Sequence, residues 1–262
     1  MASFNDLINA SFENKQDLED YLTDFFDKSN LDDYQIDDLA NDKQKEAIAK
    51  MFGNDDIFLR ADSVLFENNF CLEAFYVYYC LSDDLAISFY FNSMFSKLIN
   101  YDSLDSYEKK AIKIILEYYA MFLNDIHNIT GAIDVLESLE SIINDGSFYN
   151  DRLAILFSEI EELDKFYNLY LKDGFLTIGS YILLIIVCLK HNDEIKAKGV
   201  FTNLLDDHPI CQYIDHVWDL DNDDGEEAKM LKNALDFCYP SIYSLPYFFS
   251  WCEQNKETSL KS

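Results

Sequence analysis

Glycine and proline, the residues that end helices and shape tight turns, are nearly missing from this sequence. Only 7 glycines and 3 prolines are spread over 262 residues. A β-rich domain of this size needs many more turn residues, and a doubly wound α/β fold normally carries glycine-rich loops. The sequence therefore predicts long helices joined by short polar turns.

The spacing of apolar residues supports an all-α fold. Between Leu104 and Asn124, and again between Gly131 and Asn144, apolar residues recur at steps of three and four, the period of a helix buried on one face. The stretch from Ile178 to Leu189 is apolar on every face but shorter than a membrane span, so it predicts a buried core helix. We expect about thirteen helices of about 10–20 residues each, and no strand.

Two domains are expected from the change in polarity along the chain. Residues 1–66 are the most acidic and polar part, with the shortest apolar runs, and predict a helical N-terminal cap. Residues 67–262 carry the longer apolar helices, which follow one another in pairs. We place the boundary near Glu67.

One part of the second domain resembles a known repeat family. In residues 178–211, five side chains fall where the tetratricopeptide repeat places an aromatic residue, a leucine, a small residue, a phenylalanine and a proline: Tyr181, Leu184, Ala197, Phe201 and Pro209. Ala197 would let two helices approach closely, and Phe201 would fill the space between them. Weaker similarity extends from Glu67 to about Pro240, a second proline expected to follow a helix end.

The resemblance to tetratricopeptide repeats implies a specific architecture and a mode of action. It implies antiparallel helix pairs stacked as an irregular superhelix, capped at the N-terminal end by helices. It also implies a scaffold or adaptor that binds a protein or peptide in a groove of the repeats.

The net charge constrains the partner. The chain has 49 acidic and 20 basic residues, a net charge of −29, yet it is 49% hydrophobic and 16% aromatic. A chain with this much apolar material buries a core, so the acid must coat a folded surface. Such a surface repels nucleic acid and anionic membranes and attracts basic proteins. The alternative function is an acidic nucleic-acid mimic that blocks a basic nucleic-acid-binding protein.

No motif for catalysis, cofactor binding or metal binding emerges. The acidic run Asp219–Glu227 lacks the glycine and the bidentate glutamate at the positions that a calcium loop requires. His208, Cys211 and His216 lack a fourth ligand and a shared helix face, so we expect Cys211 in the core and the imidazoles at the surface. We predict a non-enzymatic protein with neither cofactor nor metal.

The cysteines and the first residues indicate a compartment. Six cysteines lie mostly inside apolar runs without paired spacing, which is typical of free thiols in a reducing cytoplasm. Met1–Asn14 lacks the basic start and apolar run of a signal peptide. We therefore expect a cytoplasmic protein.

Aromatic runs mark the candidate binding residues. Residues 70–81 and 89–95 carry rings on several helix faces, which favours burial at the centre of the fold. A terminal helix has fewer neighbours, so exposed rings there would form a docking surface or a homodimer seam. The partner-binding residues that we predict in this C-terminal segment are Tyr243, Tyr247, Phe248 and Trp251.

Overall fold

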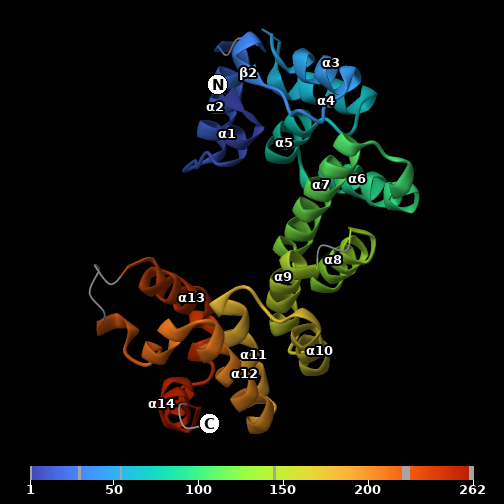
Figure 1. Ribbon diagram of the computed structural model, residues 1–262. Helices are drawn as coiled ribbons and strands as arrows, with labels where there is room; N and C mark the ends of the chain where they lie inside the picture. Colours follow the sequence, from blue (N-terminus) through green and yellow to red (C-terminus); the bar gives the residue numbers. More distant parts are fainter. Residues whose placement is uncertain (1, 29–30, 54, 144–145, 220–224, 260–262) are drawn as a thin grey trace. The chain divides into compact units, whose positions relative to one another are not determined.

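The computed structural model in Figure 1 describes residues 2–28, 31–53, 55–143, 146–219 and 225–259. Helices take up 79% of it, and they include 14 α-helices, which confirms the all-α prediction. The strands of the described part are two residues each, β1 (Ala2–Ser3) and β2 (Tyr34–Gln35), paired in parallel. Strands this short have no apolar period, so the sequence pattern could not reveal them.

The chain divides into two compact units, Met1–Ile126 and His127–Ser262. The boundary expected near Glu67 falls inside the first unit instead. Glu67 ends helix α4 (Ile57–Glu67), which packs closely against α5 (Leu72–Leu81) across a short turn. A change in polarity along the sequence therefore does not coincide with a change in packing here.

The first unit is built around α5. Residues Leu72–Val77 are buried on every face of this helix. It contacts all the other α-helices of the unit, and α4 makes the largest contact. The remaining α-helices of the unit are α1 (Phe4–Ile8), α2 (Lys15–Lys28), α3 (Asp42–Met51), α6 (Asp84–Ser96) and α7 (Ser106–Asp125), with 3-10 helices at Leu31–Asp33 and Lys97–Ser103.

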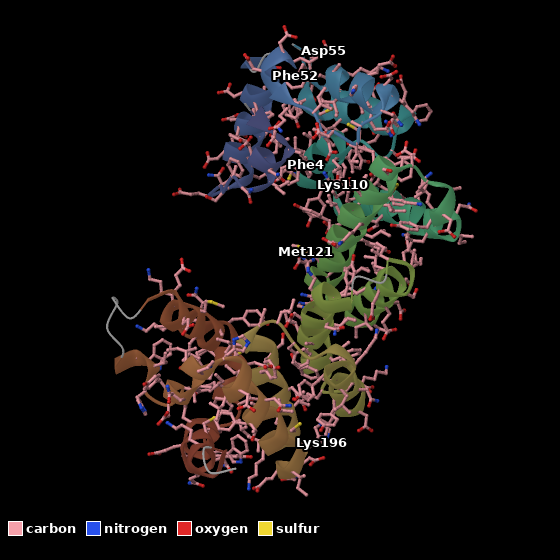
Figure 2. All side chains as sticks on the ribbon, in the orientation of Figure 1. Phe4, Phe52, Asp55, Lys110, Met121 and Lys196 are labelled. Atoms are coloured by element: carbon pink, nitrogen blue, oxygen red, sulfur yellow. The ribbon has the colours of Figure 1, made fainter. Side chains whose placement is uncertain are left out.

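Aromatic rings fill the space around α5. Phe75 and Phe91 are fully buried, with ring centroids 6.0 Å apart, and Phe75 also meets Tyr118 of α7 edge to face at 5.4 Å. Central burial of the two aromatic runs is thus confirmed for these rings, although Phe89 is 69% exposed. Lys110 of α7, labelled in Figure 2, forms an ion pair with Asp37 and ties the segment before α3 to this helix.

The second unit is built around α11 (Ile178–Lys190). Its residues Ile178–Leu189 are all buried, as predicted, and it contacts four helices of the same unit. No helix in the described part of the chain is long and apolar enough to cross a membrane. The other helices are α8 (Ile129–Ile143), α9 (Gly146–Glu159), α10 (Leu163–Asp173), α12 (Glu194–Asp207), α13 (Gly225–Tyr243), α14 (Phe248–Ser259), and 3-10 helices at Pro209–Tyr213 and Val217–Asp219.

Two helix pairs of this unit share one turn geometry. α9 and α10 are joined through Glu161, and α11 and α12 through Asn192, both with left-handed backbone at φ 52° and 57°. In each turn the next residue's N–H, from Glu162 or Asp193, bonds to the carbonyl five residues earlier. The turns also contact each other, because His191 Nε2 lies 3.1 Å from the Glu161 carbonyl oxygen. Consecutive helix pairs are therefore stacked with their turns side by side.

The sequence predictions for individual positions have different outcomes. Ala197 and Phe201 are fully buried in α12, which packs along α11, as predicted. Pro209 follows the end of α12, but Pro240 lies inside α13. Pro240 has no backbone N–H, so at this position α13 lacks the hydrogen bond to the carbonyl four residues earlier.

Candidate partner-binding surface

The four predicted binding residues divide into two exposed and two buried side chains. Tyr243 is 76% exposed and Tyr247 is 48% exposed, whereas Phe248 is fully buried and Trp251 is only 6% exposed. The prediction that Phe248 and Trp251 form part of an accessible surface is therefore wrong for this folded state.

Packing of the terminal helix explains this correction. The indole of Trp251 meets the ring of Phe201 edge to face, with centroids 5.5 Å apart. Cys252 beside it is also fully buried. α14 thus lays one face on α12, and its buried rings stabilise the unit itself.

The exposed tyrosines belong to the outer face of α13 and the turn after it. α13 buries Leu231, Leu235 and Cys238, which places Tyr239 and Tyr243 on its solvent side. The two rings lie 6.3 Å apart, and Tyr239 is 57% exposed. We call Tyr239, Tyr243 and Tyr247 the tyrosine surface.

A hollow of about 470 Å³ adjoins Tyr247. This volume lies within the usual range of ligand-binding pockets. Two segments form its walls: the turn after α13 contributes Tyr247, and the end of α11 with the α11–α12 turn contributes the other residues. Those other lining residues are Leu189, His191, Asn192, Asp193, Glu194 and Ile195.

The wall formed by the α11–α12 turn is fixed by hydrogen bonds. The carboxylate of Asp193 caps α12 by accepting the Lys196 N–H at 3.1 Å, and its other oxygen lies 3.4 Å from the Lys196 ammonium. Desolvation works against the charged form of Lys196, but the hydrogen bond and charge of Asp193 raise its pKa overall. The wall is therefore organised before any partner arrives.

Ile195 and Glu194 complete the hollow with two accessible groups. Ile195 is 86% exposed although it is aliphatic. The side chain of Glu194 is 65% exposed and lies 3.7 Å from the Lys198 ammonium, a surface ion pair of the kind that contributes little. The hollow thus combines apolar walls, one aromatic ring and an accessible carboxylate.

The groove expected from the repeat resemblance is not formed by α11. A groove-lining helix presents polar residues to solvent, whereas Ile178–Leu189 are buried without exception. The neighbouring helices cover α11 on all sides. The accessible features of this unit include the tyrosine surface and the hollow.

The three residues considered for metal binding differ in their exposure to solvent. Cys211 is fully buried, His208 is partly buried against the ring of Tyr181, and His216 is exposed. Burial raises the pKa of the Cys211 thiol to about 12, so it carries a proton at neutral pH. The described residues contain no cluster of three or more metal-ligating side chains. The acidic run Asp219–Glu227 lies largely outside the described residues.

One ionic cluster resembles part of a catalytic site but has a structural explanation. Asp215 lies 2.7 Å from His216 Nδ1 and pairs with Lys256 of α14. Burial alone would raise the pKa of Asp215, but the hydrogen bond and charge of Lys256 lower it overall. The adjacent thiol of Cys252 is fully buried, and its pKa is raised by desolvation. The cluster fastens α14 to the segment that follows α12 and offers no thiolate nucleophile.

Comparison with known proteins assigns no relatives: no family model matches the chain, and it matches neither a curated protein nor a solved structure. Membership of the tetratricopeptide family therefore remains a prediction.

Sequence reasoning missed the hollow. Its one detectable sign is Ile195, which lies off the apolar face of α12 defined by Ala197, Val200, Phe201 and Leu204. An isoleucine on the solvent side of an amphipathic helix is a hint of a contact surface. No local sequence pattern predicts that Tyr247, 52 residues further along the chain, lines the same hollow as Ile195.

Proposed function

We propose that this chain is a non-enzymatic interaction protein whose second unit binds a basic protein or peptide through the tyrosine surface and the adjoining hollow. The observation that carries the proposal is the exposure of Tyr239, Tyr243 and Tyr247 on a chain with a net charge of −29. Tyrosines supply large contact areas with little loss of side-chain entropy, which is why they are enriched in interfaces.

Charge decides between a second copy of the chain and a different partner. Two copies that each carry −29 repel one another, whereas a basic partner is attracted over several ångströms of solvent. The proposal therefore favours a basic partner over a homodimer and excludes direct contact with nucleic acid or anionic membranes. The stacked helix pairs support a tetratricopeptide-like scaffold role. The six free cysteines support a reducing, cytoplasmic location.

The competing function, a nucleic-acid mimic, is supported only by the excess of acidic side chains. Asp17, Asp20 and Asp24 are exposed on α2 at spacings of three and four residues, so they share one face of that helix. A mimic would use such faces in both units and would not depend on the tyrosines. This difference makes the two functions separable by experiment.

The test is a capture experiment with two matched variants. The immobilised full chain, a triple variant Tyr239→Ser, Tyr243→Ser, Tyr247→Ser, and a control triple variant Leu85→Ser, Phe89→Ser, Ile99→Ser are exposed to native lysate and washed across a salt gradient. The control residues are 68–87% exposed, more than the tyrosines as a set, and lie in the first unit. We expect basic proteins that are retained at high salt by the wild type and the control but lost by the tyrosine variant.

The opposite pattern supports the mimic. An affinity that drops more than about a hundredfold between low and high salt, with no effect of the tyrosine variant, would identify a charge-driven complex. Tight binding of the purified protein to DNA or RNA would exclude both functions.

A further inference from the structure

We propose that the hollow beside Tyr247 is a recognition pocket for a single long basic side chain, a lysine or an arginine, of the partner. The inference rests on the proposed function, because it gives a place and a chemistry to the basic partner. It makes Ile195, Glu194 and Tyr247 the residues that determine specificity.

The shape and lining of the hollow suit this occupant. Lysine and arginine carry a long apolar stem and a charged end, and they place the two in different environments. The exposed side chain of Ile195 supplies apolar surface for the stem, and the half-exposed Tyr247 at the hollow supplies an aromatic ring for the cation. The carboxylate of Glu194 supplies the counter-charge at the same hollow.

The chain already uses the same chemistry internally, next to the hollow. The ammonium of Lys196, labelled in Figure 2, lies 4.9 Å from the centroid of the Tyr167 ring. The same ammonium lies 3.7 Å from Asp164 and 3.4 Å from Asp193. A cation between a tyrosine face and carboxylates is therefore a stable arrangement in this unit, and the hollow offers an accessible counterpart.

Binding does not require rearrangement of the turn. Asp193 is committed to capping α12 and to Lys196, so the incoming cation meets Glu194, whose exposed pair with Lys198 is weak. The N–H of Asp193 bonds to the Cys188 carbonyl at 2.9 Å, which holds the left-handed turn in place. A preformed pocket loses little conformational freedom when it is filled.

Amide chemical shifts of the ¹⁵N-labelled full chain test the pocket directly. The probe is Nα-acetyl-arginine methylamide, and the matched probe is Nα-acetyl-norleucine methylamide, which keeps the apolar stem but lacks the charge. We expect the arginine probe to shift the amides of residues 191–195 and to bind at least about tenfold more tightly than the norleucine probe. Equal binding of both probes, or arginine-induced shifts only elsewhere, would overturn the inference.

Four variants identify the contacts. Glu194→Gln should weaken the arginine probe about fivefold and leave the norleucine probe unchanged, because only the counter-charge is removed. Tyr247→Leu should weaken the arginine probe about threefold, whereas Tyr247→Phe, which keeps the ring, should not. Tyr213→Leu, at a 38% exposed tyrosine of the same unit that lies outside both the hollow and the tyrosine surface, is the matched control and should have no effect. If neither Glu194→Gln nor Tyr247→Leu changes arginine binding, the pocket is not the one proposed.

The two proposals fail in different ways. If the probe does not bind but basic proteins are still captured in a tyrosine-dependent manner, only the side-chain pocket is wrong. If the probe binds at residues 191–195 but no basic protein is captured, the pocket stands and the proposed function is wrong.

Discussion

The central helices of the two units, α5 and α11, are both apolar on nearly every face, but they are held in place by different interactions. The buried residues of α11 are almost all apolar and include no ionisable carboxyl; Ser180 and Tyr181, whose hydroxyl donates to Asp207 of α12, are its polar exceptions, so hydrocarbon packing dominates. α5 buries the carboxyl group of Glu73, which is only 4% exposed. The hydroxyl of Tyr34 donates to Glu73 Oε1 at 2.7 Å, and the thiol of Cys71 donates to Oε2 at 3.7 Å.

Apolar packing and a buried hydrogen-bonded carboxyl differ in how strictly they fix the position of a helix. Packing of apolar side chains contributes most of the stability but tolerates alternative arrangements of similar volume. A buried carboxyl is satisfied in only one arrangement, since an unpaired polar group in the core is costly. Glu73 therefore fixes Tyr34, 39 residues earlier in the chain, against α5 and specifies one docking of β2. The position of α11 therefore depends mainly on apolar packing, whereas the position of α5 depends in addition on a buried, hydrogen-bonded carboxyl.

The largest expected effect tests the apolar packing of the second unit. Phe201→Ala should lower the free energy of unfolding by about 3–5 kcal/mol, because Phe201 is fully buried on the helix that packs along α11. Native-state hydrogen exchange should show the loss in α11 and α12 peptides. Phe89→Ala, at a 69% exposed position, is the control. An unchanged melting temperature for Phe201→Ala would refute the packing described for this unit.

A smaller effect tests the buried hydrogen bond between Tyr34 and Glu73 in the first unit. Tyr34→Phe removes the hydroxyl that donates to Glu73 and should cost about 1–3 kcal/mol, although it removes a single oxygen atom. The loss should appear in hydrogen exchange of α5 peptides. Tyr101→Phe, a partly exposed tyrosine of the same unit, is the matched control. If the two variants are equally stable, the buried tie contributes nothing to the position of α5.

The pH dependence of stability sharpens the comparison further. Burial raises the pKa of Glu73 above its ordinary value of 4.5, and the Tyr34 hydrogen bond offsets this only in part. Below pH 4.5 the carboxyl is protonated in both states. As the pH rises, the unfolded chain releases its proton first, so the free energy of unfolding falls until the folded-state pKa has been passed.

Glu73→Gln removes this dependence. The stability difference between this variant and the wild type should therefore grow in favour of the variant from about pH 4.5 upward and then level off, as measured by urea unfolding at a series of pH values. The background effect of the remaining acidic residues is common to both proteins and cancels. A difference that does not vary with pH would show that Glu73 does not titrate in this range.

The smallest expected effect concerns the tyrosine surface. Tyr243→Ala and Tyr239→Ala should each change the free energy of unfolding by less than about 0.5 kcal/mol, because both side chains are largely exposed. Trp251→Ala, only a few residues further along the chain, should instead destabilise strongly because Trp251 is buried against Phe201. Thermal unfolding of the three variants measures this contrast. A stability loss at Tyr239 or Tyr243 similar to that at Trp251 would place those rings in the core.

The sequence by itself determined the helical content, the central role of residues 178–189 and the burial of Ala197 and Phe201. The first two features depend on local periodicity, which repeats every 3.6 residues and can be read without knowing any partner. The burial of Ala197 and Phe201 is expected from the positions that these two residues share with the tetratricopeptide repeat. Helix caps are local in the same way: Asp193 caps α12 and Asp105 caps α7, and each carboxylate accepts the backbone N–H of the residue three positions further on.

Only the tertiary structure decided which aromatic residues are buried and which surface is accessible. Tyr243, Tyr247, Phe248 and Trp251 are all aromatic and close together in sequence, but the fold buries Phe248 and Trp251, the latter against Phe201 of α12, and leaves the two tyrosines exposed. The Tyr34–Glu73 tie and the hollow beside Tyr247 likewise join residues 39 and more positions apart. Contacts between distant segments depend on how helices dock, and docking is decided by the combined shape of many side chains, which no local pattern contains.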